Sequence, residues 1–227
     1  MSARMRTVEV VRAAFWAART DRHRPSSRIR PGYMVAEASR GETGELARAM
    51  GVIEDVPRAR FGRGARAWVA YSPDGAVAAW VWVSTGRERA VPIRRELRFA
   101  EDEAYGWDAG TLPRHRGLGL FTVLLEQSGN TMRCEGRTVM WGGIHDHNLA
   151  SRRASVHAGF SPVLRFSALL LGPTSLIRAR AADYADPDLV RRAHRVLGSA
   201  PESAVDPRQP AGEVASAAAP AQRRNPQ

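Results

Sequence analysis

The sequence predicts one α/β domain built around a mixed sheet, and three observations lead to this fold class. Residues 65–83 are predicted to form a hairpin, with apolar strands on both sides of the turn SPDG. Residues 113–171 alternate helix, strand, helix and strand, which is typical of an α/β domain. A chain of 227 residues is long enough to bury one substantial core.

The elements before the hairpin are predicted from periodicity and turn residues. Residues 5–19 space apolar side chains at helical intervals, which predicts an amphipathic helix. Residues 20–32 are expected to be loop, and residues 33–38 are expected to form a short strand. A second helix is expected over residues 43–50, because a glycine follows it directly. Residues 55–64 are expected to be irregular.

A longer extended stretch follows the hairpin. Residues 95–112 have no helical period and contain internal glycines, so one strand is expected there, broken or bulged near its acidic centre. Residues 120–132 carry apolar side chains at helical spacing and predict a helix. Residues 138–144 are mostly apolar and predict a strand.

The next helix is delimited by its capping residues. Asn148 suits the start of a helix, and Gly159 suits the position just after its end. Residues 162–171 predict a last strand, and weak helices are expected near residues 174–180 and 187–197.

Composition excludes several classes of protein. No apolar run approaches the roughly 18 residues of a membrane span, and the N-terminus lacks the uninterrupted apolar core of a signal peptide. The single cysteine, Cys134, cannot form an intramolecular disulfide. A cytoplasmic protein without membrane partners is therefore expected, followed by a disordered tail at residues 198–227, which are rich in Ala, Pro and polar residues.

The formal charge of +11 favours anionic partners, either a nucleic acid or a polyphosphate ligand. All of the positive side chains are arginines, and they are scattered along the chain rather than gathered in one block. No nucleic-acid-binding motif is present, so a nucleic-acid partner is disfavoured. The sequence His145-Asp146-His147 is interpreted as solvated or facing substrate, and no metal site is predicted.

The stretch PRHRGLGLFTVLL, residues 113–125, combines arginines, glycines and a helix start. A helix N-terminus has unpaired N–H groups that favour an anion. Gly117 and Gly119 leave the backbone uncovered, and Arg114 and Arg116 add charge. A Walker loop is excluded because the chain has no lysine. The dinucleotide fingerprint also fails, because its third glycine would fall at Thr122.

This stretch resembles the pyrophosphate loop of the GNAT acetyltransferases. Arg116 and Gly119 match the loop pattern, whereas Phe121 stands where the family has a small residue. A second register, from Arg114, satisfies the pattern fully and stays open. Residues 147–160 are similar to the family's later motif, an asparagine followed by a helix that Gly-Phe closes.

The resemblance implies the GNAT fold, in which a parallel strand pair splays apart within a mixed, mostly antiparallel sheet flanked by helices. It implies that residues 66–197 form the acyl-CoA-binding core. Residues 1–65 would belong to the same domain and shape the acceptor pocket. The residues that it places at acyl-CoA are Thr111, Leu112, Arg114, Arg116, Gly117, Leu118, Gly119, Leu120, Phe121 and Asn148.

The resemblance also implies where the catalytic groups lie. A general base is expected on the strand before the loop, and Glu103, Tyr105 and Asp108 are the candidates. The family often has a tyrosine as general acid four residues before the glycine of Gly-Phe, and this sequence has Ser155 there.

The implied activity is an N-acyltransferase that moves an acetyl or other acyl group from CoA to an amine of a small molecule or a protein. Acetyl-CoA would be the acyl donor, and a homodimer is left open. The competing hypothesis is a non-catalytic GNAT-fold module that binds acyl-CoA or nucleic acid. Ser155 in place of tyrosine and Phe121 in place of a small residue motivate this alternative.

Overall fold

The computed structural model describes residues 9–21 and 27–199. The tail expected at residues 198–227 therefore lies almost wholly outside the described residues, as does the start of the helix expected over residues 5–19.

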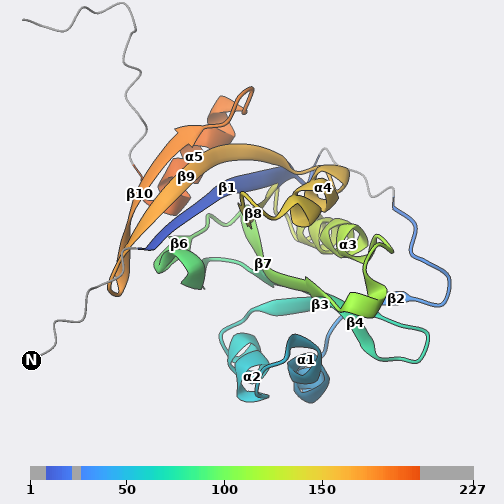
Figure 1. Cartoon of the computed structure of the whole chain (residues 1–227). Coiled ribbons are helices and arrows are strands. Elements are labelled where there is room, and N and C mark those ends of the chain that lie inside the picture. Colours follow the sequence, from blue (N-terminus) through green and yellow to red (C-terminus); the bar gives the residue numbers. More distant parts are fainter. Residues whose placement is uncertain (1–8, 22–26, 200–227) are drawn as a thin grey trace, which may run out of the picture.

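An eight-stranded mixed sheet forms the centre of the fold, in the order β10-β9-β1-β8-β7-β4-β3-β2 (Figure 1). Of the strand pairs among the described residues, β7 with β8 alone is parallel. This confirms a mixed, mostly antiparallel sheet. The strands are β1 (Glu9–Arg19), β2 (Met34–Glu37), β3 (Arg66–Tyr71), β4 (Val77–Ser84), β7 (Glu103–Thr111), β8 (Val139–His145), β9 (Ser161–Leu171) and β10 (Thr174–Ala181).

Helices cover both faces of this sheet. Buried side chains of α3 pack with one set of alternating strand residues, and those of α1, α2 and α5 pack with the opposite set. A small second sheet, β5 with β6, lies beside α5. These elements are α1 (Thr43–Met50), α2 (Asp55–Gly62), α3 (Leu120–Cys134), α4 (Leu149–His157), α5 (Pro187–Leu197), β5 (Arg87–Ala90) and β6 (Arg95–Arg98), with short 3₁₀ turns η1 (Arg40–Glu42), η2 (Val91–Ile93) and η3 (Pro113–His115).

Several predicted elements are confirmed within a few residues. The hairpin is β3–β4, and the predicted helices at residues 43–50, 120–132 and 187–197 are α1, α3 and α5. Asn148 caps α4 by accepting a hydrogen bond from the Ser151 backbone N–H at 3.1 Å. Within the described ranges, no helix is long and apolar enough to cross a membrane.

The helix predicted over residues 5–19 is wrong, because residues 9–19 form strand β1. This strand lies between β8 and β9 and pairs with both. Its side chains are buried on both faces: Phe15 belongs to the cluster beside α5, and Trp16 to the cluster beside α3. A strand buried on both sides has no alternation of polar and apolar residues, so its pattern resembles that of a buried helix.

Three further expectations are corrected. Residues 55–64 contain the helix α2, which buries Phe61 against the sheet. The weak helix near residues 174–180 is instead the strand β10, whose alternate residues Ser175 and Ala179 are buried. Residues 95–112 contain two strands in different sheets, because β6 pairs with β5 while β7 joins the large sheet.

The parallel pair β7–β8 is hydrogen-bonded along only part of its length. Pairing runs from Glu103 beside Val139 to Gly106 beside Gly142. Beyond this point β7 pairs only with β4, and β8 pairs with β1. The two strands therefore part after Gly106, and one edge of each is left without a strand partner.

Candidate functional site

A glycine-containing turn connects β7 to α3. After η3, Gly117 and Gly119 both have φ of +75°, a conformation that side chains other than glycine rarely adopt. A Cβ at either position would have no atom within 4 Å, so both glycines face open space. The turn therefore presents bare backbone to a ligand.

The start of α3 carries unpaired donors. Gly119 is the N-cap and has no side chain with which to cap the helix. The first helical bond is donated by Val123 N–H to Gly119 O, at 3.2 Å. Among residues 9–21 and 27–199, no hydrogen-bond acceptor is recorded for the backbone N–H groups of residues 117–122. These groups and the helix dipole favour an anion at this position.

The two arginines of the turn point to different places. The Arg114 Nε–H donates to His115 Nε2 at 2.8 Å, so the other ring nitrogen, Nδ1, carries the proton and bonds to Tyr33 Oη at 2.8 Å. Arg116 Nε–H instead donates to the Thr111 carbonyl at 3.2 Å and lines the cleft described next. Arg116 therefore faces the cleft, whereas Arg114 does not line it. Sequence reasoning missed buried His115, because a lone histidine in a turn carries no pattern.

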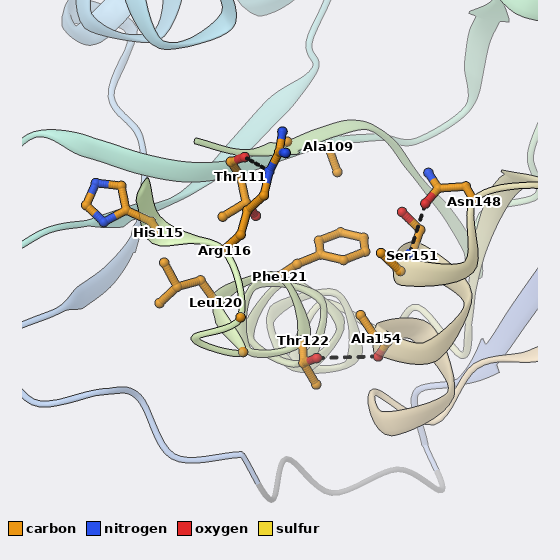
Figure 2. Close-up of a pocket in the computed structure, with 14 residues that line it drawn as sticks. Ala109, Thr111, His115, Arg116, Leu120, Phe121, Thr122, Asn148, Ser151 and Ala154 are labelled. Carbon is orange, nitrogen blue, oxygen red and sulfur yellow. Dashed lines mark hydrogen bonds between the residues drawn. The ribbon is translucent and has the colours of Figure 1, made fainter. Parts of the chain in front are cut away.

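A cleft of about 530 Å³ lies in front of this turn (Figure 2). It is lined by the end of β7, the turn, the start of α3 and the first turn of α4. Thr122 Oγ1 donates to Ala154 O at 3.5 Å and joins the two helices across its base. The cleft thus brings the two sequence motifs together. Its lining residues from the motifs include His115, Arg116, Gly117, Gly119, Leu120, Phe121, Asn148 and Ser151.

The open edge of β7 forms one wall of the cleft. Leu112 is not part of this wall, because its N–H donates to Ala78 O and its carbonyl accepts from His115 N–H, both at 2.9 Å. Backbone groups alternate in direction along a strand, so those of Thr111 and Ala109 face away from β4 and towards the open edge. Of the predicted pair, the structure places Thr111 at the cleft and Leu112 outside it, while Leu118 packs against the core.

A second, smaller cavity of about 140 Å³, here called the gap, continues the cleft between β7 and β8. The cleft and the gap share four lining residues: Ala109, Phe121, Asn148 and Ser151. Figure 2 shows the Phe121 ring pointing towards the start of α4 rather than across the glycine turn. Phe121 therefore narrows the passage between the two cavities and leaves the amides of the turn uncovered.

Two tryptophans with buried indole groups are among the residues that line the gap. Trp16 and Trp141 are 3% and 0% exposed, and their Nε1–H donors have no hydrogen-bond partner among the described residues. A buried donor without an acceptor carries a desolvation penalty of about 1–3 kcal/mol. The Trp141 indole stacks on Phe15 in the cluster beside α5, with ring centroids 5.0 Å apart. Trp16 packs in the cluster beside α3, and a ligand carbonyl in the gap would supply an acceptor for its indole N–H.

The predicted catalytic residues do not gather at one point. Glu103 is fully buried at the paired end of β7, where Arg195 bonds both of its oxygens at 2.6 Å and Ala100 N–H donates to it at 2.8 Å. It lines neither the cleft nor the gap. Its position is that of a structural ion-pair residue.

Tyr105 lies on the other face of the sheet and stacks on Phe99, with ring centroids 5.2 Å apart. Burial, with a contribution from the nearby Glu88, raises the pKa of Tyr105 well above its usual value. The phenol therefore keeps its proton and is unsuited to accept one.

Asp108 and Ser155 both line the gap. Asp108 has φ of +40° at a bulge in β7, a strained conformation for a residue with a side chain. Its carboxylate pairs with Arg60 of α2 at 2.5 Å. Ser155 is buried on α4 beside Phe160. Sequence reasoning did not foresee Arg60, which also lies 4.7 Å from the centroid of the Trp107 ring.

Comparison with solved structures identifies the fold. The chain is similar to an acetyltransferase described as GNAT-family from Novosphingobium aromaticivorans, at 18% identity over 72% of this chain and 65% of that one (TM-score 0.53). A GCN5-related N-acetyltransferase from Sphaerobacter thermophilus matches at 13% identity over 77% and 53% (TM-score 0.53). A GNAT-family acetyltransferase from Colwellia psychrerythraea matches at 16% identity over 72% and 56% (TM-score 0.50).

The matched region spans between about half and two thirds of the length of those three proteins. No family model and no curated protein matches the sequence. At these identities the likeness concerns the fold alone. The chain therefore has the GNAT fold, which confirms the fold expected from the two motifs.

Proposed function

We propose that this protein is an acyl-CoA-dependent N-acyltransferase of the GNAT family, which moves an acetyl or other acyl group from CoA to an amine. One observation carries the proposal: the unpaired N–H groups of residues 117–122 face open space at the mouth of a cleft that continues between β7 and β8. The fold shared with GNAT acetyltransferases supports it.

The residues of the cleft fit a CoA thioester. The amides from Gly117 to Thr122 would hold the diphosphate, and the exposed Arg116 side chain at the cleft would add charge. The open edge at Ala109 and Thr111 offers backbone groups to the amides of pantetheine. The unpaired indole N–H of Trp16 would find an acceptor on the same chain.

Bound acyl-CoA would supply an activated carbonyl, and the protein would supply position and proton transfer. Of the four predicted catalytic residues, Asp108 and Ser155 line the gap and can touch a reacting group there. The buried Ser155 hydroxyl can donate a hydrogen bond to a departing sulfur. Arg60 keeps the Asp108 carboxylate in a fixed position, which suits Asp108 to orient an incoming ammonium group.

The two segments of the domain would have different roles at the cleft and the gap. Residues 66–197 contain the cleft, the glycine turn and α4, and we assign acyl-CoA binding to them. The segment before residue 66 contributes Trp16 to the gap and, through α2, the Arg60 that holds Asp108.

Two measurements on the purified protein test the proposal. Calorimetric titration with acetyl-CoA should show binding at one site, and free thiol should appear when amines are added. Binding without thiol release from a broad amine library would favour the non-catalytic acyl-CoA module. The absence of binding at millimolar acetyl-CoA would contradict the proposal.

A further inference from the structure

A third cavity lies on the face of the sheet opposite the cleft. It has a volume of about 60 Å³ and is here called the chamber. Side chains from β1, the η2–β6 segment, β9 and α5 make it almost entirely apolar, among them Val11, Phe15, Ile93, Leu97, Phe166 and Leu197. Two polar side chains, Tyr105 and His145, are part of its lining. Exposed Pro92 lines it too.

The chamber meets the gap where β7 and β8 part. Gly143 and His145, the residues that both cavities share, lie on β8 just beyond its last pairing with β7. The cleft, the gap and the chamber therefore adjoin one another in series, from the glycine turn to the opposite face of the sheet. A group in the chamber lies next to whatever occupies the end of the gap.

His145 stands at this junction. It is half-buried, and no hydrogen bond to its imidazole is recorded among residues 9–21 and 27–199. Its ring lies near that of exposed His147, with centroids 5.4 Å apart. Among the described residues, the other titratable groups that line its two cavities are Tyr105 in the chamber and Asp108 in the gap. Asp146 is next in sequence and lines a neighbouring cavity together with Arg12.

We infer that the chamber holds the apolar group of the acceptor and that His145 accepts the proton of its amine, so that the substrate is a compact apolar monoamine. This inference rests on the proposed acyltransferase function and names its acceptor class. His145 is the imidazole at the point where the thioester and the amine would meet.

The lining of the chamber defines the amine class. Among the described residues, no Asp, Glu or Arg side chain lines it. A polyamine or an aminoglycoside would find no carboxylate for its further ammonium groups, and an amino acid would find no guanidinium for its carboxylate. The volume has room for roughly five water-sized groups, since each needs about 10–15 Å³. A branched alkyl or single-ring group is therefore the expected size.

The proton balance is simple. An amine arrives as its ammonium ion and gives one proton to a ring nitrogen of His145. Its nitrogen then bonds to the thioester carbon, the carbon–sulfur bond breaks, and the second proton of the nitrogen goes to the released thiolate. His145 returns its proton to solvent, and the products are an amide and free CoA thiol.

An acceptor panel tests the class. With saturating acetyl-CoA, thiol release should show kcat/KM at least about tenfold higher for isoamylamine and benzylamine than for spermidine, glycine or a lysine peptide. Calorimetry should also show benzylamine binding to the protein saturated with CoA. Preference for spermidine, glycine or the peptide would overturn the inference and leave the acyltransferase function standing. No turnover of any amine would instead contradict the proposed function.

Two variants test the assigned positions. His145→Gln should lower kcat about a hundredfold and flatten the pH profile of kcat/KM. The matched control His147→Gln should keep that pH dependence, and both should bind acetyl-CoA as wild type does. Ala90→Leu, at the chamber wall, should raise KM for benzylamine and leave KM for methylamine unchanged. An unaltered pH profile in His145→Gln, or equal KM effects on both amines, would overturn the assignment.

Discussion

The two halves of the β7–β8 strand pair use their backbones differently. From Glu103 to Gly106 the strands are hydrogen-bonded to each other, and the neighbouring residues Ala104, Val139 and Trp141 are fully buried. From Trp107 onward β7 has lost this partner. The gap occupies the space between the two strands, and the cleft lies against the open edge of β7.

The charged and polar groups at the two ends of the strand pair also differ in whether they have partners. At the paired end, Arg195 and Arg192 both lie within ion-pair distance of Glu103, and Arg192 also bonds Asp102. At the open end the glycine turn leaves a row of amides without acceptors, and among the described residues the Arg116 guanidinium has no carboxylate partner. In this strand pair, the carboxylates of the paired end are satisfied within the chain, whereas the amides of the open end are available to a ligand.

The substitution with the largest expected effect lies at the paired end of β7 and β8 and acts on stability. Glu103→Ala should lower the free energy of unfolding by about 3 kcal/mol, because it leaves two arginines beside a buried cavity. The change should be measured by urea denaturation, with exposed Glu101→Ala as the control. The folded variant should keep its acetyl-CoA affinity, and a catalytic role for Glu103 would instead abolish turnover without loss of stability.

Gly119→Ala should have the next largest effect, which is a loss of acetyl-CoA affinity. The methyl group would cover the amides of the turn, and acetyl-CoA affinity should fall roughly 30-fold as two charge-assisted hydrogen bonds weaken. The left-handed backbone adds a stability loss of about 1–2 kcal/mol.

Gly51→Ala is the matched control for this variant. Gly51 has φ of +68° at the end of α1 and also faces open space. It should lose similar stability and keep full affinity by calorimetry. Equal affinity losses in the two variants would refute the role of the turn.

Separate substitutions of the two arginines in the turn test which of them begins the loop pattern. Arg116→Ala should weaken acetyl-CoA binding about tenfold, and added salt should reduce the difference from wild type. Arg114→Ala should change affinity little, because Arg114 bonds His115 away from the cleft. A larger loss in Arg114→Ala would establish the second register.

The smallest effect concerns acid stability at the paired end. Burial tends to raise the pKa of Asp102, but hydrogen bonds from Arg192 and Thr138 outweigh it and hold this pKa below its ordinary value of 3.8. Because the pKa is lower in the folded state, the ionised Asp102 stabilises the protein at pH values above the ordinary pKa. This stabilisation disappears as the pH falls through the folded-state pKa. Asp102→Asn should therefore flatten the loss of unfolding free energy below about pH 4, whereas an unchanged slope would assign acid unfolding to other carboxylates.

Local signals were enough to predict most of the fold. The hairpin β3–β4, the helix α3 and the capped helix α4 each carry a periodicity or a turn residue that acts over a few positions. The strand β1 was missed because it is buried on both faces, which removes the alternation by which strands are recognised.

The candidate site was predictable only in part, for a physical reason. The glycine turn and Asn148 belong to motifs, so sequence reasoning found both sides of the cleft. The parting of β7 from β8 was expected only through the resemblance to a known fold. The unpaired Trp16 indole and the position of His145 arise from contacts between distant segments, which no local pattern reports. Glu103 and Tyr105 were chosen by their place on the strand, and the structure shows that their side chains are used elsewhere.

Hydrogen–deuterium exchange with and without acetyl-CoA tests the central claim most directly, because it reports each half of the strand pair separately. The account predicts slower exchange on binding at residues 107–111 and 117–122. No change is expected at residues 103–106, whose amides are already in a buried, paired strand. Unchanged exchange at residues 117–122 under saturating acetyl-CoA would contradict the account.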